Sequence, residues 1–190
     1  MVDQIKILGF AGSLRRASYN RGLIRAAAVS APPGTTLEVY DLADIPLYNQ
    51  DVEDAGEPAS VMAFKRALAS ADALLIATPE YNHGMPGVLK NALDWASRPR
   101  ASSPLHDKPI AVAGASPGRG STARAQAQLR EAAVFTGACV MPLPELLIAS
   151  AATHFDHEGN LVDPETRADL VQLVAALRAW TIRLRLDAAA

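Results

Sequence analysis

The sequence has 190 residues, of which 49% are hydrophobic and 20% are charged, and its formal net charge is −2. This composition excludes an intrinsically disordered chain, and the length suits one domain over residues 1–190 with a full hydrophobic core. No long run of one charge sign occurs, so we expect no nucleic-acid partner, because nucleic-acid binding needs a basic face.

The cysteine count and the N-terminal segment indicate the compartment. Cys139 is the only cysteine, so no intrachain disulfide can form, and its neighbours in "ACVM" favour a small buried side chain over a nucleophile. The segment "MVDQIKILGF" lacks the basic start and long apolar core of a signal peptide. No apolar run is long enough to cross a bilayer. We therefore expect a cytoplasmic protein without a membrane partner.

Short apolar runs alternate with longer, helically patterned segments. The runs, bounded by Gly, Pro, Ser or Asp, predict strands at 5–12, 36–42, 71–79, 109–116 and 138–142. Three of them are almost wholly apolar, which is typical of parallel strands covered on both faces. Helices are predicted between the strands at about 20–30, 58–70, 86–97 and 121–136. The segment 97–109, which contains several prolines, predicts a mobile surface loop.

The C-terminal segment predicts the clearest helix. Asp163 can cap its first amides and Pro164 suits the first helical position. Apolar residues then recur at steps of three and four and form one face: Leu170, Leu173, Val174, Leu177, Trp180 and Leu184. The alternation of strands and helices indicates a three-layer α/β/α fold with right-handed crossovers, whose ligands bind at the carboxyl ends of the strands.

The first polar loop, "GSLRRASYN" (12–20), joins the first strand to the first helix. Free backbone N–H groups at a helix start attract an anion, and the loop adds hydroxyl and amide groups and the guanidinium of Arg15. This set suits a phosphomonoester. The alternative is an ordinary capped helix start with solvated arginines, which we apply to Arg16, Arg21 and Arg25. A P-loop is excluded because G-x-x-x-x-G-K-[ST] is absent, and Gly9 and Gly12 do not form G-x-G-x-x-G.

The second polar loop opens the segment "PEYNHGMPGVLKNALDW" (79–95), after the third strand. If strands 1 and 3 are neighbours, as in the order 2-1-3-4-5, this loop lies beside the first one. A phosphate on one loop and an exposed tyrosine edge on the next indicate a flat heterocycle with a phosphorylated tail.

The two signatures together resemble those of the NADPH-dependent FMN reductase family, and within it the bacterial quinone and chromate reductase branch. The resemblance runs from the first strand to about residue 163. It implies a flavodoxin-like fold with a five-stranded parallel sheet of order 2-1-3-4-5, tightly bound FMN, NADPH or NADH as co-substrate, and a homodimer or homotetramer. Some tetrameric members carry a tyrosine near the position of Ala127. This chain lacks that tyrosine, which argues against the same subunit contact here.

The resemblance also implies which residues bind the cofactor. By this likeness the FMN phosphate is held in the first loop, where the cofactor-binding residues are Ser13, Arg15, Ser18, Tyr19 and Asn20. The isoalloxazine is bordered by Pro79, Glu80, Tyr81, Asn82 and His83. The loop "SPGRG" resembles the segment on the pyrimidine side, with Ser116, Pro117, Gly118 and Gly120, whose backbone amides suit the flavin carbonyl oxygens.

The expected activity is hydride transfer from NAD(P)H through FMN to quinones, and also to chromate, azo compounds or free flavin, by a ping-pong mechanism. No side-chain catalyst is required. His83 is a weak candidate proton donor, and a solvent-exposed loop histidine is the simpler interpretation. Two alternatives stay open, a flavodoxin-like electron carrier and a flavin-free phosphate-binding module. Such carriers tend to be strongly acidic, which disagrees with a net charge of −2.

Three further groups of residues receive structural interpretations. The segment "HFDHEG" (154–159) predicts a hairpin-like turn rather than a metal site, because adjacent polar residues rarely converge. Asp41 resembles the ribose-binding acid of dinucleotide folds, but the glycines of that motif are missing. On the third helix, the polar and aromatic positions Lys90, Asn91, Asp94 and Trp95 are explained by a dimer contact.

Overall fold

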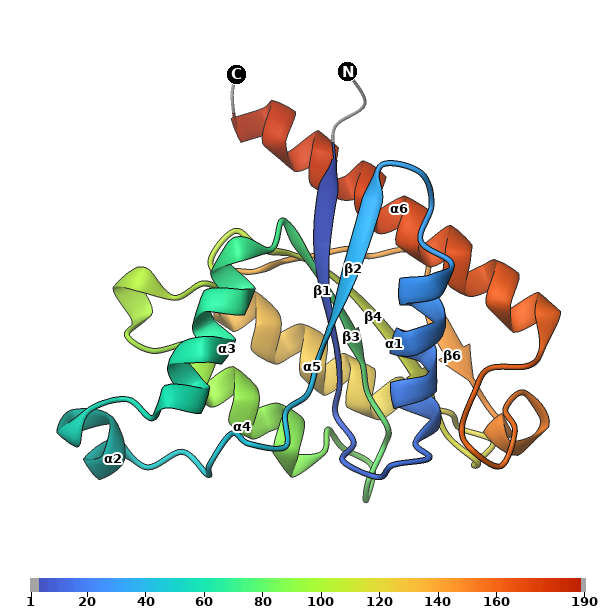
Figure 1. Cartoon of the computed structure of the whole chain (residues 1–190), viewed down its shortest axis with the longest axis horizontal. Coiled ribbons are helices and arrows are strands. Elements are labelled where there is room, and N and C mark those ends of the chain that lie inside the picture. The colour runs from blue at the N-terminus through green and yellow to red at the C-terminus, as the bar shows by residue number, and fades with distance from the viewer. Residues whose placement is uncertain (1–3, 189–190) are drawn as a thin grey trace.

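Six strands form one sheet in the computed structural model, which describes residues 4–188 (Figure 1). They are β1 (Ile5–Ala11), β2 (Thr35–Tyr40), β3 (Ala73–Ala77), β4 (Pro109–Ala115), β5 (Cys139–Val140) and β6 (Leu146–Ile148). The helices are α1 (Tyr19–Val29), α2 (Gln50–Ala55), α3 (Ala59–Ser70), α4 (Gly87–Ala96), α5 (Ala123–Phe135) and α6 (Pro164–Ala188), with short 3₁₀ helices η1 (Arg100–Ser102) and η2 (Ala151–Thr153).

All strand pairs in the sheet are parallel, and the order is β2-β1-β3-β4-β5, which confirms the predicted topology. The fifth position is shared by two short strands, because β6 also pairs with β4. Pro142 and Pro144 interrupt this position and lack the backbone N–H that a sheet needs. The predicted strand 138–142 is therefore shorter in the structure, and β6 was missed because three residues carry no readable alternation.

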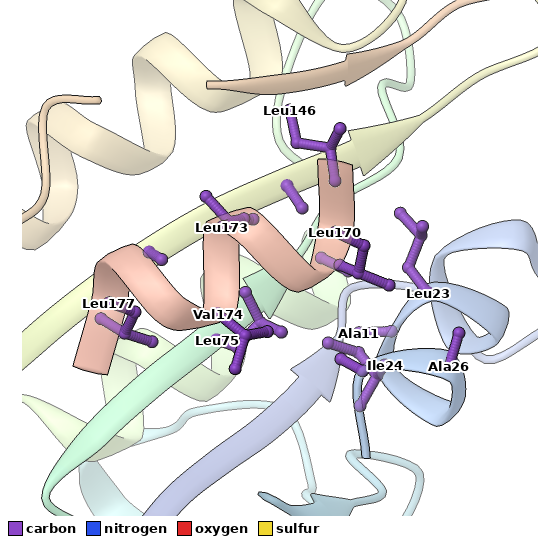
Figure 2. Close-up of a cluster of buried hydrophobic side chains, with 14 of the residues drawn as sticks. Ala11, Leu23, Ile24, Ala26, Leu75, Leu146, Leu170, Leu173, Val174 and Leu177 are labelled. Atoms are coloured by element: carbon purple, nitrogen blue, oxygen red, sulfur yellow. The ribbon is translucent and has the colours of Figure 1, made fainter. Parts of the chain in front are cut away.

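Helices cover both faces of the sheet and enclose two apolar cores. α1 and α6 pack on one face, and α3, α4 and α5 pack on the other. Figure 2 shows four α6 residues (Leu170, Leu173, Val174 and Leu177) directed toward the strands, so the predicted apolar face is confirmed for these four. Trp180 is partly buried against the same core, and Leu184 does not belong to it. Asp163 Oδ2 accepts the Thr166 amide at 2.8 Å, which is the predicted cap. Burying each such leucine contributes about 1.5–3 kcal/mol.

Two segments differ from the predictions. The segment 97–109 is anchored rather than loose, because Leu105 is buried and Ser103 Oγ donates to Ala96 O at 3.1 Å. On α4, Asn91 and Trp95 are buried, and both donate to Pro46 O at 2.8 Å. These two residues therefore hold the segment after β2 against α4, which corrects their interpretation as dimer contacts.

The segment after β6 forms the predicted hairpin-like turn and packs behind α1. Phe155 and Leu161 form an antiparallel bridge, and Gly159 closes the turn with an N–H bond to Asp156 O of 3.0 Å. A Cβ atom on Gly22 of α1 would lie 2.0 Å from Gly159 O, so the two backbones touch. None of the helices within residues 4–188 is long and apolar enough to span a membrane.

Candidate flavin site

Three polar loops meet where β1, β3 and β4 end. The backbone joins them, because Gly12 N donates to Ala77 O at 2.8 Å and Thr78 N donates to Ala113 O at 2.9 Å. Gly12 lies so close to the start of α4 that a Cβ atom there would be 2.9 Å from Pro86 Cγ and 3.0 Å from Leu89 Cβ. The first and second polar loops are therefore neighbours, as the predicted strand order required.

The first loop presents backbone donors. Ser18 caps α1, and its Oγ accepts the Arg21 amide at a long 3.5 Å. The amides of residues 13–17 donate to no acceptor within the described residues 4–188. Ser13 is only 4% exposed, so its side chain does not lie on the outer surface. These free N–H groups lie just before the N-terminus of an eleven-residue helix, where backbone donors and the helix dipole suit an anion.

The first loop presents two exposed arginines, Arg15 and Arg16, and Arg15 is the one that packs on an aromatic ring of the loop. Its guanidinium lies 5.1 Å from the centroid of the Tyr19 ring, and Tyr19 in turn packs on Phe155 with a ring separation of 5.0 Å. Within residues 4–188 Arg15 forms no ion pair, so its charge is available to a ligand. Tyr19 thus supports the arginine from below, and the turn after β6 supports Tyr19.

The other arginines on α1 are engaged elsewhere. Arg21 binds Asp41 through two hydrogen bonds of 3.3 and 2.7 Å. Arg25 donates to Gly159 O and Asn160 Oδ1, both at 3.0 Å. Burial acts to raise the pKa of Asp41, but hydrogen bonds from Arg21 and the Ala43 amide outweigh it and hold the pKa below its usual value. Asp41 therefore pairs with Arg21 instead of serving a ribose.

Asn20, which we expected at the phosphate, makes a structural bridge with its side chain. Its Nδ2 donates to Ala115 O and its Oδ1 accepts from Ala115 N, both at 2.9 Å. These two bonds tie α1 to the carboxyl end of β4 and leave one amide N–H unused. The first loop and the third loop are thereby held at a fixed position relative to each other. Phosphate binding by Asn20 stays a prediction.

The second loop is a tight hairpin at residues 81–84. Tyr81 and Gly84 exchange both backbone hydrogen bonds, each 3.0 Å long. The two central residues, Asn82 and His83, have φ values of 50° and 64°, and positive φ at both positions is the requirement of a type I′ turn. Tyr81 is 53% exposed and its two successors are also exposed. The hairpin therefore presents a fixed edge to any ring that binds beside it.

Glu80, which we expected at the isoalloxazine, faces the protein with its carboxylate. Oε2 accepts the amides of Arg124 and Ala125 at 2.9 and 3.2 Å, and Oε1 lies 3.6 Å from Arg124 Nη1. The side chain is 10% exposed. Sequence reasoning did not single out Gln128, whose Oε1 accepts the Met85 amide at 2.9 Å, since no local motif marks it. Contact of Glu80 with the flavin ring stays a prediction.

The third loop, at residues 116–121, leads from β4 into α5. Ser116 is held by backbone bonds to Ile148 O and from Ala151 N, of 3.0 and 3.1 Å. Beyond it, Pro117, Gly118 and Gly120 are exposed, so their backbone can be approached closely. A Cβ atom on Gly114, at the end of β4, would be 2.0 Å from Thr122 Oγ1, which explains the tight entry into α5. The predicted residues of this loop thus lie at the same sheet edge.

The residues present fit a flavin mononucleotide. The free amides of residues 13–17 and the unpaired Arg15 suit a phosphate, and the exposed hairpin edge suits a flat ring. The exposed backbone of the third loop suits polar ring atoms. Cys139 lies elsewhere, on β5, and burial raises the pKa of its thiol, which is unsuited to a nucleophile.

Comparisons with known proteins agree with this fit. Residues 5–153 match the family described as NADPH-dependent FMN reductase. An NAD(P)H-dependent FMN reductase of Pseudomonas aeruginosa is 49% identical over 185 residues, which are 97% of this chain and 100% of that protein. A 2-hydroxy-1,4-benzoquinone reductase of Burkholderia sp. is 44% identical over 176 residues, or 93% of this chain and 96% of that protein.

A solved structure extends the likeness to three dimensions. It is FerB, a flavoenzyme NAD(P)H:(acceptor) oxidoreductase from Paracoccus denitrificans, which matches with a TM-score of 0.85 at 35% identity, over 94% of this chain and 98% of that one. The family match covers more than half of the sequence, and the resemblance inferred from the two signatures is confirmed. The chain therefore belongs to the NADPH-dependent FMN reductase family, and it is an enzyme of flavodoxin-like fold that depends on FMN and NAD(P)H.

Proposed function

We propose that this enzyme reduces quinones with electrons from NAD(P)H. The observation that carries the proposal is one sheet edge that combines a loop of free backbone donors with an exposed, rigid hairpin. Relatives that align over almost the whole chain are named as quinone reductases from Burkholderia sp. and Pseudomonas putida. When bound, FMN would supply hydride acceptance from a nicotinamide and hydride donation to a quinone.

The roles of the residues follow from their positions. The amides of 13–17, with Ser13, Ser18 and Arg15, would hold the phosphate, and Tyr19 would steady Arg15 from below. The hairpin at 81–84 would border the ring, with Pro79 buried behind it. Amides of the third loop would stabilise negative charge on the pyrimidine side, as preorganised dipoles do in other active sites. The side chains therefore bind and orient, and none is needed as an acid or base.

The exposure of the hairpin supports a proposal for the order of the reaction. Tyr81, Asn82 and His83 are all exposed, so a ring bound beside them would be open to solvent on that side. A nicotinamide and a quinone would both use that side, and the first must leave before the second can bind. This predicts ping-pong kinetics. Chromate, azo compounds and free flavin would compete for the same face, and we include them as further acceptors.

Anaerobic mixing of the FMN-loaded protein with NADPH or NADH, followed by a panel of acceptors, tests the proposal. The visible flavin absorbance should disappear with the preferred nucleotide and return fastest with a quinone. Double-reciprocal rate plots at several quinone concentrations should be parallel. Intersecting lines would contradict the shared face, and a flavin that no quinone reoxidises would contradict the proposed function.

We also propose that the chain is cytoplasmic and self-associates, as a homodimer or a homotetramer. A groove of about 810 Å³ lies between α4 and α5, and Phe135 at its rim is 74% exposed with the Arg100 guanidinium 5.1 Å from its ring centroid. Light scattering should give a mass of two or four chains, and Phe135→Glu should lower it. A monomeric wild-type protein would contradict self-association, and cell fractionation tests the location.

A further inference from the structure

The hairpin at residues 81–84 adopts a backbone that its residues do not favour. Neither central residue is glycine, yet Asn82 and His83 both have positive φ. Asn and His enter this region more readily than other residues, but two in succession still carry strain. Such a conformation persists only where the surroundings determine it. The question is which contacts hold the hairpin.

Two hydrogen-bonding side chains hold it, one on each flank, and both connect it to α5. Before the hairpin, the Glu80 carboxylate accepts the amides of Arg124 and Ala125. After it, the Met85 amide donates to Gln128 Oε1 at 2.9 Å. Residues 124 and 128 are one helical turn apart and share a face of α5. The base of the hairpin is therefore fixed at two points on one rigid element.

Each of these contacts is specific for its side chain. Thr122, the N-cap residue of α5, makes no side-chain cap bond, so Glu80 supplies the acceptor that the first turn lacks. A buried carboxylate at a helix N-terminus gains from the free N–H groups and from the helix dipole. On the other flank, a Cβ atom on Gly84 would lie 2.9 Å from Gln128 Oε1, so Gln128 touches the hairpin itself.

We propose that Glu80 and Gln128 are positioning residues that set the strained hairpin against α5. The inference depends on the proposed function in one respect, namely that this hairpin borders the flavin ring. α5 also begins where the third loop ends, so the same helix relates the two ring-side loops to each other. Neither side chain acts on the reacting atoms. Their effect is to keep the edge of the site in one conformation.

Hydrogen exchange in the FMN-free protein tests the positioning directly. Tyr81 N donates to Gly84 O and Gly84 N donates to Tyr81 O, and neither amide donates to Glu80 or Gln128, so the two amides report on the hairpin alone. In Glu80→Ala and Gln128→Leu we expect both amides to exchange about tenfold faster. Glu80→Gln and Gln128→Glu keep an acceptor oxygen and should restore most of the protection. Their recovery would show that the faster exchange does not come from a misfolded protein. Unchanged exchange at both amides in Glu80→Ala and in Gln128→Leu overturns the proposal.

A second measurement uses the FMN-loaded protein. The visible circular dichroism of the flavin should change in Glu80→Ala and Gln128→Leu and recover in the conservative variants. Glu165→Gln is the matched control, because Glu165 is an exposed carboxylate in the first turn of α6. Faster exchange with a wild-type flavin spectrum overturns the positioning role while leaving the proposed function intact. A wild-type protein that binds no FMN fails the proposed function, and the exchange data still decide whether the hairpin depends on these residues.

Discussion

The first loop and the hairpin border the same site but differ in whether their backbone N–H groups have hydrogen-bond acceptors in the protein. Residues 13–17 leave their amides without acceptors within residues 4–188, whereas the hairpin at 81–84 pairs with itself and is tied to α5 on both flanks. The first loop therefore offers hydrogen bonds to a ligand, and the second offers a fixed shape. We infer that the phosphate of FMN is recognised by hydrogen bonds from the first loop. The ring is recognised by the shape of the hairpin that lies beside it.

The largest expected effect comes from forcing the two loops apart. In Gly12→Ala the new Cβ atom would lie within 3.2 Å of atoms in Pro86 and Leu89, so the loop must move. We expect a loss of about 1–3 kcal/mol of unfolding free energy and a protein that retains little FMN. Denaturant unfolding and flavin content after purification measure both. Gly87→Ala is the control, because a Cβ atom there meets nothing within 4 Å, and an equal loss in this variant would contradict the explanation.

Next in size is the removal of charge from the first loop. Arg15→Ala should weaken FMN binding about tenfold to hundredfold, because a hydrogen bond to a charged group contributes about 1.5–3 kcal/mol. Titration of FMN into the flavin-free protein, followed by quenching of flavin fluorescence, gives the Kd. Arg16→Ala, an exposed neighbour, should change the Kd less than threefold. Similar losses in both variants would mean that general positive charge, and not Arg15, binds the phosphate.

A smaller effect should follow from changing the backbone preference of the hairpin. Asn82→Ala places a residue with a Cβ atom and no compensating amide at φ 50°, and we expect a cost of about 1 kcal/mol. Asn82→Gly should be neutral. Thermal unfolding compares the two, and the flavin circular dichroism should change in the alanine variant more than the Kd does. A strong effect on Kd with an unchanged spectrum would assign the hairpin to the phosphate end.

The smallest effect concerns Asp41, whose pKa is lower in the folded protein than in the unfolded chain. Folding therefore favours the carboxylate, and this contribution is present above the unfolded pKa of about 3.9 and is lost as the pH falls through the folded value. The side chains of Arg21 and Asp41 are about one third and one half exposed, so solvent screens the pair and we expect less than about 1 kcal/mol. The stability difference between wild type and Asp41→Asn should shrink between pH 5 and about pH 2. A changed FMN Kd in this variant would place Arg21 among the phosphate ligands.

Much of the fold could be predicted because its elements carry regular patterns. The apolar run of β3 and the spacing of leucines on α6 are signals that a single sequence contains, and the strand order followed from the resemblance. β6 has three residues, and none of the α2 residues is buried, so neither carries a readable pattern. Their existence depends on neighbours that are distant in the sequence.

The candidate site was less predictable for the same reason. The motifs located the loops, but they did not reveal where each side chain points. Asn20 and Glu80 belong to the motifs, yet their side chains bind Ala115 and the start of α5 across separations of 95 and 44 residues. Gln128 lies in an ordinary helical stretch, and only the assembled fold brings it to Met85. Tertiary contacts of this kind leave no local signature.

The turn after β6 has a consequence for anyone who seeks a minimal version of this enzyme. The match to the family description ends at residue 153, yet Phe155 packs on Tyr19, and Gly159 lies against Gly22 and accepts from Arg25. A fragment that ends at residue 153 would lose the residues that pack on Tyr19 and on α1, next to the first loop. Transplanting this cofactor site into another scaffold therefore requires residues 154–161 as part of the graft.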